Sequence, residues 1–93
     1  MTFINRLHGY KISFKNSALK KLAKIDKESV IVINKKLDLL VKGIQGLNVK
    51  KLVDYQEPTY RLRVGVYRIL FEIKDNEVTV LVIDIDHRKN AYK

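Results

Sequence analysis

The feature that most constrains the fold is a run of β-branched and leucine residues near the C-terminal end of the chain. Residues 78–83 read Val-Thr-Val-Leu-Val-Ile, inside a segment, 77–85, that we expect to be one strand. Such residues favour β-structure, and a strand that is apolar on both faces is usually buried inside its sheet. We therefore expect a central strand here, with the other strands of the chain paired beside it.

Three further strands are predicted by the alternation of apolar and polar residues. In residues 8–14 every second side chain is apolar, which is typical of a half-buried strand. Residues 60–64 and 66–74 are also expected to be strands, so the second half of the chain forms an antiparallel meander. The turns of the meander are expected at Gly65 and at Asp75-Asn76.

Two helices are predicted between the first strand and the meander. Apolar residues recur at helical spacing in residues 18–25 and again in residues 30–44. The short connection between them predicts an antiparallel helical hairpin. The expected caps are Asn16 or Ser17 for the first helix, Asp26 for the start of the second, and Gly43 or Gly46 for its end.

The order of these elements predicts an α+β fold. Residues 47–59, which contain the chain's only proline, are expected to be a linker within the domain. An N-terminal strand, a helical hairpin and a three-strand antiparallel meander then form a small four-stranded, mostly antiparallel sheet, covered on one face by the helices. We expect residues 1–93 to be a single domain, because no repeat or change in composition divides them.

The composition favours an anionic partner. The 93 residues include 19 Lys and Arg against 10 Asp and Glu, a formal net charge of +9, which makes nucleic acid a reasonable partner class. The absence of cysteine excludes a disulfide framework, a thiolate zinc site and a cysteine nucleophile. We expect no metal site, because no two histidines, and no histidine together with carboxylates, have the spacing of metal ligands. We also expect no cofactor. Without a visible signal peptide or membrane-length apolar run, we expect a soluble cytoplasmic protein.

Three arginines are expected to meet on the uncovered face of the sheet. Arg61 and Arg63 alternate with the apolar residues of their strand, and Arg68 lies opposite the apolar face of the next. Folding alone gives no reason to gather like charges there, whereas a ligand with several negative charges would explain them. The alternative is that they form surface salt bridges, which stabilise a fold little. The carboxylates available for that are Glu72, Asp84 and Asp86.

The C-terminal tail adds candidate functional groups beside this face. His87 has an unperturbed pKa near neutrality, Arg88 adds a further guanidinium, and Tyr92 offers a phenol and a ring on which a base can stack. We interpret His8, near the other terminus, as an ordinary strand or loop residue.

Several segments, taken in order, resemble the RelE/ParE superfamily of toxins and, within it, the RelE-like mRNA interferases. The match runs along almost the whole chain, and its most specific part is the strand pair followed by His87-Arg88 and Tyr92. The strand pair is Tyr60-Arg61-Leu62-Arg63-Val64-Gly65 and Tyr67-Arg68-Ile69. The other segments are Tyr10-Lys11-Ile12-Ser13-Phe14, Ala18-Leu19-Lys20-Lys21-Leu22 and Asn48-Val49-Lys50-Lys51-Leu52.

The resemblance implies a toxin of a type II toxin–antitoxin system. Such toxins cut mRNA, commonly on the ribosome and without a metal, by attack of a 2′-hydroxyl on the adjacent phosphate. The family's basic pair on the second strand falls on Arg61 and Arg63, its next arginine on Arg68, and its C-terminal pair on Arg88 and Tyr92, with His87 just before. The best-studied type has lysines at the strand pair. Since arginine is not a general base at neutral pH, Arg61 and Arg63 are better suited to stabilising the phosphorane.

The resemblance also implies a partner and leaves two other functions open. The partner is a small acidic, RelB-like antitoxin that covers the basic surface. The first alternative is a non-catalytic, ParE-like inhibitor of DNA gyrase, and the second is an RNA-binding module without cleavage. Lysines expected to contact RNA, or else to form a solvated face, are Lys20, Lys21, Lys35, Lys36, Lys50 and Lys51.

Overall fold

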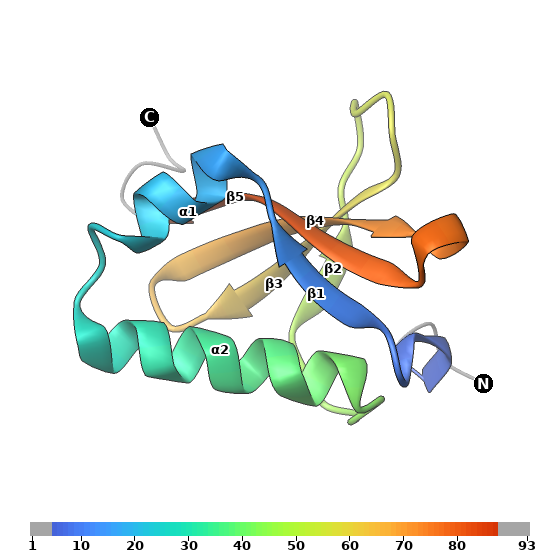
Figure 1. Cartoon of the computed structure of the whole chain (residues 1–93), viewed down its shortest axis with the longest axis horizontal. Helices are drawn as coiled ribbons and strands as arrows, with labels where there is room; N and C mark the ends of the chain where they lie inside the picture. Colours follow the sequence, from blue (N-terminus) through green and yellow to red (C-terminus); the bar gives the residue numbers. More distant parts are fainter. Residues whose placement is uncertain (1–4, 88–93) are drawn as a thin grey trace.

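The computed structural model of the chain describes residues 5–87, with side chains from Arg6 onward. Arg88 and Tyr92, which the sequence analysis singled out, lie outside these residues. No helix within residues 5–87 is long and apolar enough to cross a membrane. The elements in chain order are a 3-10 turn η1 (Asn5–Leu7), β1 (Lys11–Phe14), α1 (Asn16–Leu22), α2 (Lys27–Val41), β2 (Val49–Lys51), β3 (Thr59–Val64), β4 (Tyr67–Lys74), a 3-10 turn η2 (Asp75–Glu77) and β5 (Thr79–His87) (Figure 1).

The sheet has five strands in the order β1-β5-β4-β3-β2, so the expectation of four strands was wrong. β1 pairs in parallel with β5, and the other neighbours are antiparallel. The additional strand, β2, lies in the expected linker. It has three residues, two of them exposed lysines, so it shows no alternation. Its pairing with β3 makes it an edge strand, and the backbone bond from Arg63 N to Asn48 O, 2.9 Å long, extends that pairing.

β5 is an interior strand, as its composition predicts, and it carries a β-bulge. Leu70 of β4 pairs with Asp84, but its neighbour Phe71 pairs with Val82, which leaves Ile83 as an extra residue. The bulge reverses the alternation of β5. Val82 and Ile85 therefore both face the core, while Asp84 and, further on, Asp86 face the other side of the sheet.

The two helices begin and end for identifiable local reasons. α1 is shorter than expected and is capped by Lys15 rather than by Asn16 or Ser17, without a side-chain bond. For α2 the prediction of Asp26 as N-cap is confirmed, because its carboxylate accepts a hydrogen bond of 3.0 Å from Ser29 N. Beyond the end of α2, Gly43 has a φ of +73°. The bonds from Gly43 N to Leu40 O and from Ile44 N to Leu39 O form a Schellman motif.

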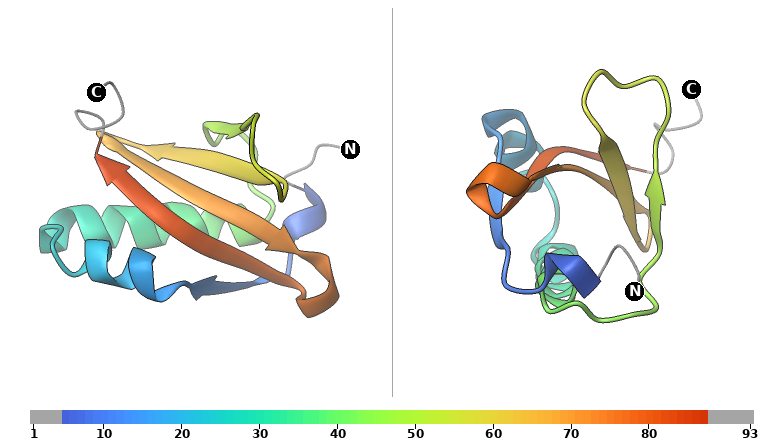
Figure 2. Two further views of the ribbon diagram at one scale, coloured as in Figure 1. Left: turned by 90° about the horizontal axis from the view of Figure 1, so that it is seen from above. Right: turned by 90° about the vertical axis from the view of Figure 1, so that its right-hand side faces the viewer.

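Both helices lie on one side of the sheet and leave the other side without a helix (Figure 2). α1 packs against β5, and α2 packs across β1 and β3. The core lies between these layers and combines the apolar face of α2 with the inner residues of β3, β4 and β5. Its largest fully buried side chains include Ile33, Leu37, Leu40, Leu62, Ile69, Phe71, Val80 and Val82.

Candidate phosphate-binding face of the sheet

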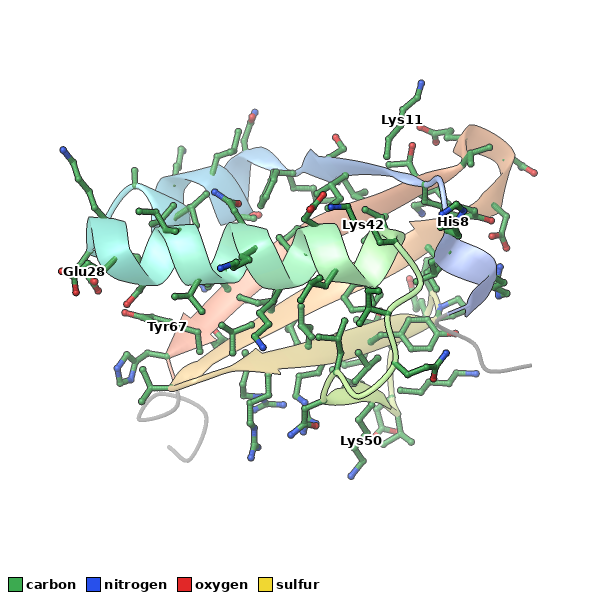
Figure 3. All side chains as sticks on the ribbon, turned by 90° about the horizontal axis from the view of Figure 1, so that it is seen from below. His8, Lys11, Glu28, Lys42, Lys50 and Tyr67 are labelled. Carbon is green, nitrogen blue, oxygen red and sulfur yellow. The ribbon has the colours of Figure 1, made fainter. Side chains whose placement is uncertain are left out.

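The strand register brings basic side chains together on the face that no helix covers. Arg63 and Arg68 are direct cross-strand partners, Arg61 is opposite Leu70, and Lys50 of β2 is opposite Arg61. Since paired residues point to the same side of a sheet, these four basic residues share one surface, which we call the arginine face. Figure 3 shows Lys50 on the side of the sheet away from α2, whereas Tyr67 points toward that helix.

The arginine face places like charges close together in a partly buried setting. Arg61, Arg63 and Arg68 are all half-buried, and like charges directly opposite one another destabilise a strand pair by up to about 1 kcal/mol. The Nε atom of Arg68 is buried and has no hydrogen-bond partner among residues 5–87. A guanidinium with an unused donor in such a place suits a multiply charged anion, whose oxygens match its planar fork.

The alternative expectation, that the arginines pair with carboxylates of the sheet, does not hold for Arg63 and Arg68 in the described residues. Within residues 5–87, neither Arg63 nor Arg68 lies within ion-pair distance of a carboxylate. The carboxylates are held by lysines instead. Lys74 Nζ lies 3.0 Å from Glu72 Oε1. Lys21 Nζ lies 2.6 Å from Asp84 Oδ1 and 3.2 Å from Asp86 Oδ1. The hydrogen bond from Lys21 to Asp84 raises the pKa of Lys21, and that from Lys74 to Glu72 raises the pKa of Lys74.

Asn48 is a residue of the site that sequence reasoning did not single out. Its side-chain oxygen accepts a hydrogen bond of 2.7 Å from Arg61 Nη2, and its backbone oxygen accepts one of 2.9 Å from Arg63 N. Asn48 therefore fixes both the position of β2 beside β3 and the direction of the Arg61 guanidinium. An asparagine two residues before a basic pair was visible in the sequence, but only the unrecognised strand β2 gives it this role.

His87 is described by the structure, but it does not join the arginines. It is the cross-strand partner of Tyr67, and the two rings meet edge to face with centroids 5.3 Å apart. Tyr67 faces α2, so His87 lies on the helix-covered side of the sheet. At this end of the sheet the two rings help to line a hollow of about 360 Å³, together with Lys21, Lys24, Ile25, Ile85 and Asp86.

The lysines expected to contact RNA do not form one surface. Only Lys50 lies on the arginine face, because Lys51 is opposite Tyr60 and points to the other side. Lys21 is the lysine that binds Asp84 and Asp86. The remaining three lie on helices, Lys20 exposed on α1, and Lys35 exposed and Lys36 half-buried on α2.

Comparison with known proteins assigns the chain to a family. Residues 12–92 match the family described as the ParE toxin of type II toxin–antitoxin systems, parDE. The chain belongs to the RelE/ParE toxin superfamily. As a type II toxin, it carries its arginine face entirely within the matched residues. In sequence, 35 residues of the toxin are 40% identical to Toxin RelG of Mycobacterium tuberculosis, a match that spans 40% of that relative's length.

Solved structures of RelE toxins share the fold of this toxin. The toxin–antitoxin complex RelBE2 from Mycobacterium tuberculosis superposes with a TM-score of 0.71 at 26% identity, covering 87% of this toxin and 93% of the matched chain. The isolated E. coli RelE toxin superposes with a TM-score of 0.70 at 23% identity, covering 85% of this toxin and 84% of that chain. The archaeal RelE of Pyrococcus horikoshii, which was crystallised with RelB, gives 0.69 at 19% identity over 85% and 94% of the two chains.

Proposed function

We propose that this toxin is a metal-independent endoribonuclease that cleaves mRNA, on the ribosome, at a phosphodiester bound by the arginine face. The observation that carries the proposal is the grouping of Arg61, Arg63 and Arg68 on an uncovered sheet face whose strand carboxylates are held by lysines. This leaves the guanidinium groups of Arg63 and Arg68 available for the two non-bridging oxygens of a phosphate. The likeness to solved RelE toxins supports the same reaction class.

The proposed reaction needs charge stabilisation more than it needs a nucleophile from the protein. The 2′-hydroxyl of the RNA loses its proton and its oxygen attacks the neighbouring phosphorus, after which the bond to the 5′-oxygen breaks and that oxygen takes up a proton. The products are a 2′,3′-cyclic phosphate and a 5′-hydroxyl. Arg61, Arg63, Arg68 and Arg88 would stabilise the phosphorane, whose negative charge exceeds that of the substrate.

Proton transfer is assigned to the C-terminal segment, because arginine stays protonated at any usable pH. The candidates are Tyr92, which would also stack on a base, and His87. The position of the His87 ring against Tyr67, on the helix side, favours Tyr92. A pH–rate profile of the wild type without an inflection near neutrality would agree with Tyr92, and an inflection that His87→Gln removes would assign the step to His87.

The lysines would contribute to RNA binding according to their positions. Lys50 lies beside Arg61 and would contact the RNA backbone next to the scissile phosphate. Lys20, Lys35, Lys36 and Lys51 lie elsewhere on the surface and would add long-range attraction for ribosomal RNA. We also propose a small acidic, RelB-like antitoxin as the partner, since RelE relatives were crystallised with RelB and the net charge of +9 attracts an acidic chain.

The direct cellular test is primer extension on mRNA after induction of the toxin. Wild type is expected to produce new 5′ ends within coding regions, and Arg68→Ala to abolish them. Lys27→Ala is the matched control, because it removes one exposed positive charge from the start of α2 and should cut like wild type. Equal cleavage by wild type and Arg68→Ala would contradict the assignment of the face.

A second candidate function is inhibition of DNA gyrase without catalysis, because the matched family is described as the ParE toxin. The two functions differ in the first process that stops after induction. Early arrest of translation together with cut mRNA supports the nuclease, whereas early arrest of replication with DNA damage supports the gyrase inhibitor. Salt-sensitive RNA binding without any cut RNA would instead indicate a plain RNA-binding module.

A further inference from the structure

The acidic residues of the sheet lie among its arginines. Glu72, Asp84 and Asp86 are the carboxylates of strands β1–β5, and the register puts all of them on the arginine face. Asp86 is the direct cross-strand partner of Arg68, and Asp84 is its diagonal neighbour. Such neighbours have Cβ atoms about 5 Å and 7–8 Å apart, which is within the reach of a guanidinium. Ion pairs between Arg68 and these aspartates are therefore the ordinary expectation.

A lysine from a helix occupies both aspartates instead. Lys21 lies in the last turn of α1, where that helix flanks β5 beyond the end of β1. Ser17 Oγ of the same helix donates a hydrogen bond of 3.1 Å to Ile83 O, at the bulge, and so ties α1 to β5. From there Lys21 Nζ reaches Asp84 Oδ1 at 2.6 Å and Asp86 Oδ1 at 3.2 Å. All three side chains are a third to a half exposed, so the bridge lies at the rim of the face.

We propose that Lys21 is a positioning residue of the arginine face, which holds Asp84 and Asp86 so that Arg68 stays available to a phosphodiester. Lys74 holds Glu72, the third carboxylate of the face, in the same way. The inference rests on the proposed binding of RNA at this face, and it gives Lys21 a role different from direct contact with RNA. Without Lys21, the phosphate must displace the aspartates from Arg68 before it can bind.

The role of Lys21 predicts that replacing it weakens RNA binding only while Asp84 and Asp86 are charged. A general loss of positive charge would weaken binding with or without these carboxylates. The probe is a 2′-O-methyl oligoribonucleotide, which lacks the 2′-hydroxyl and cannot be cut, and the readout is its affinity for the full chain. Lys21→Met is expected to weaken binding about tenfold, the size of a lost hydrogen bond to a charged group. The matched control is Lys24→Met, which removes an exposed lysine that, like Lys21, lines the hollow beside Tyr67 and His87. It is expected to weaken binding about twofold.

A double-mutant cycle isolates the proposed interaction. In the wild-type background Asp84→Asn with Asp86→Asn is expected to change affinity little, because Lys21 already binds both carboxylates. In the Lys21→Met background the same two aspartate substitutions are expected to restore most of the lost affinity. In the Lys24→Met background they are expected to restore none. Lys21→Arg, which keeps the charge and the reach, is expected to bind like wild type, and thermal unfolding of each variant shows that it folds.

The outcomes separate this inference from the proposed function. Equal losses in Lys21→Met and Lys24→Met, or an effect of the aspartate pair that is the same in every background, would overturn the role of Lys21 while leaving the nuclease in place. Binding with the predicted coupling but no cleavage of mRNA on ribosomes would overturn the nuclease and support Lys21. A wild-type chain that binds the probe neither free nor on ribosomes would overturn both.

Discussion

At the scale of single residues, the site depends on the hydrogen bonds that position each arginine side chain. Arg61 is directed by Asn48, whereas Arg68 has a buried Nε atom that no described residue uses. An arginine that is already directed loses less conformational freedom when it binds phosphate, which is how preorganised donors contribute to catalysis. In the proposed site Asn48 would therefore be a positioning residue for Arg61, although it has no chemistry of its own to offer.

The first prediction concerns this residue. Asn48→Ala removes the bond of 2.7 Å to Arg61 Nη2, and we expect the single-turnover cleavage rate to fall about tenfold, as for a lost hydrogen bond to a charged group. Asn34→Ala, at an exposed position of α2, is the control and should cleave like wild type. Unchanged cleavage by Asn48→Ala would mean that Arg61 needs no support from β2.

At the scale of elements, a cluster of polar side chains joins the start of the chain to the turn between β4 and β5. Asp75 Oδ1 in η2 accepts a hydrogen bond of 2.7 Å from Tyr10 Oη and one of 2.9 Å from Arg6 Nη1. These donors, the Tyr10 hydroxyl first and Arg6 second, lower the pKa of Asp75. The cluster ties η1 to the end of the sheet that lies away from His87.

The second prediction follows from the sign of that shift. A carboxylate whose pKa is lower in the folded than in the unfolded state stabilises the fold above its unfolded pKa, roughly pH 4, and this contribution is lost as the pH falls through the folded value. Thermal unfolding of wild type should therefore lose stability on acidification below about pH 4 more steeply than that of Asp75→Asn. Parallel pH curves for the two proteins would show that the cluster contributes nothing.

The elements also show which parts of the structure a sequence can predict. Both helices and the strands of the meander follow from spacings of three to four and of two residues, which local sequence contains. β2 lacks such a signal, because its three residues Val49–Lys51 are half-buried or exposed and it forms only by pairing with β3. The bulge at Ile83 has no unambiguous local mark either, since Ile83 lies where the apolar run 80–82 meets the alternating Asp84-Ile85-Asp86.

The candidate site was predictable to the same extent. Alternation places Arg61, Arg63 and Arg68 on one face, because each strand is regular where they lie. The hold of Lys21 on Asp84 and Asp86 joins residues more than sixty positions apart in the chain, and the side taken by His87 depends on the register of β5 with β4. Both are consequences of packing, so neither spacing nor composition could indicate them.

At the scale of the whole molecule, positive charge is not confined to the arginine face, because exposed lysines also lie on both helices. The formal net charge of +9 attracts any polyanion at long range, and such attraction governs how fast partners meet more than how tightly they finally bind. In the proposed function, specific recognition of a phosphodiester is left to the arginine face. An acidic antitoxin and RNA would therefore compete for the same field.

The third prediction tests this electrostatic attraction. The association rate of the toxin with the proposed acidic antitoxin should fall steeply as salt is added, because screening shortens the range of the attraction. Stopped-flow measurements at rising salt provide the rate, and the dissociation rate serves as the internal comparison, since it should change much less. An association rate that is independent of salt would contradict a role for the net charge.

The central claim is that the arginine face stabilises a phosphodiester as it is cut. The most direct measurement is single-turnover cleavage of mRNA on purified ribosomes by the wild-type toxin and by Arg68→Ala, with the chemistry of the new ends determined. We predict 2′,3′-cyclic phosphate and 5′-hydroxyl ends, and a rate about a hundredfold lower for Arg68→Ala, which corresponds to about 3 kcal/mol of transition-state stabilisation. Equal rates for the two proteins, or intact mRNA with the wild type, would contradict the claim.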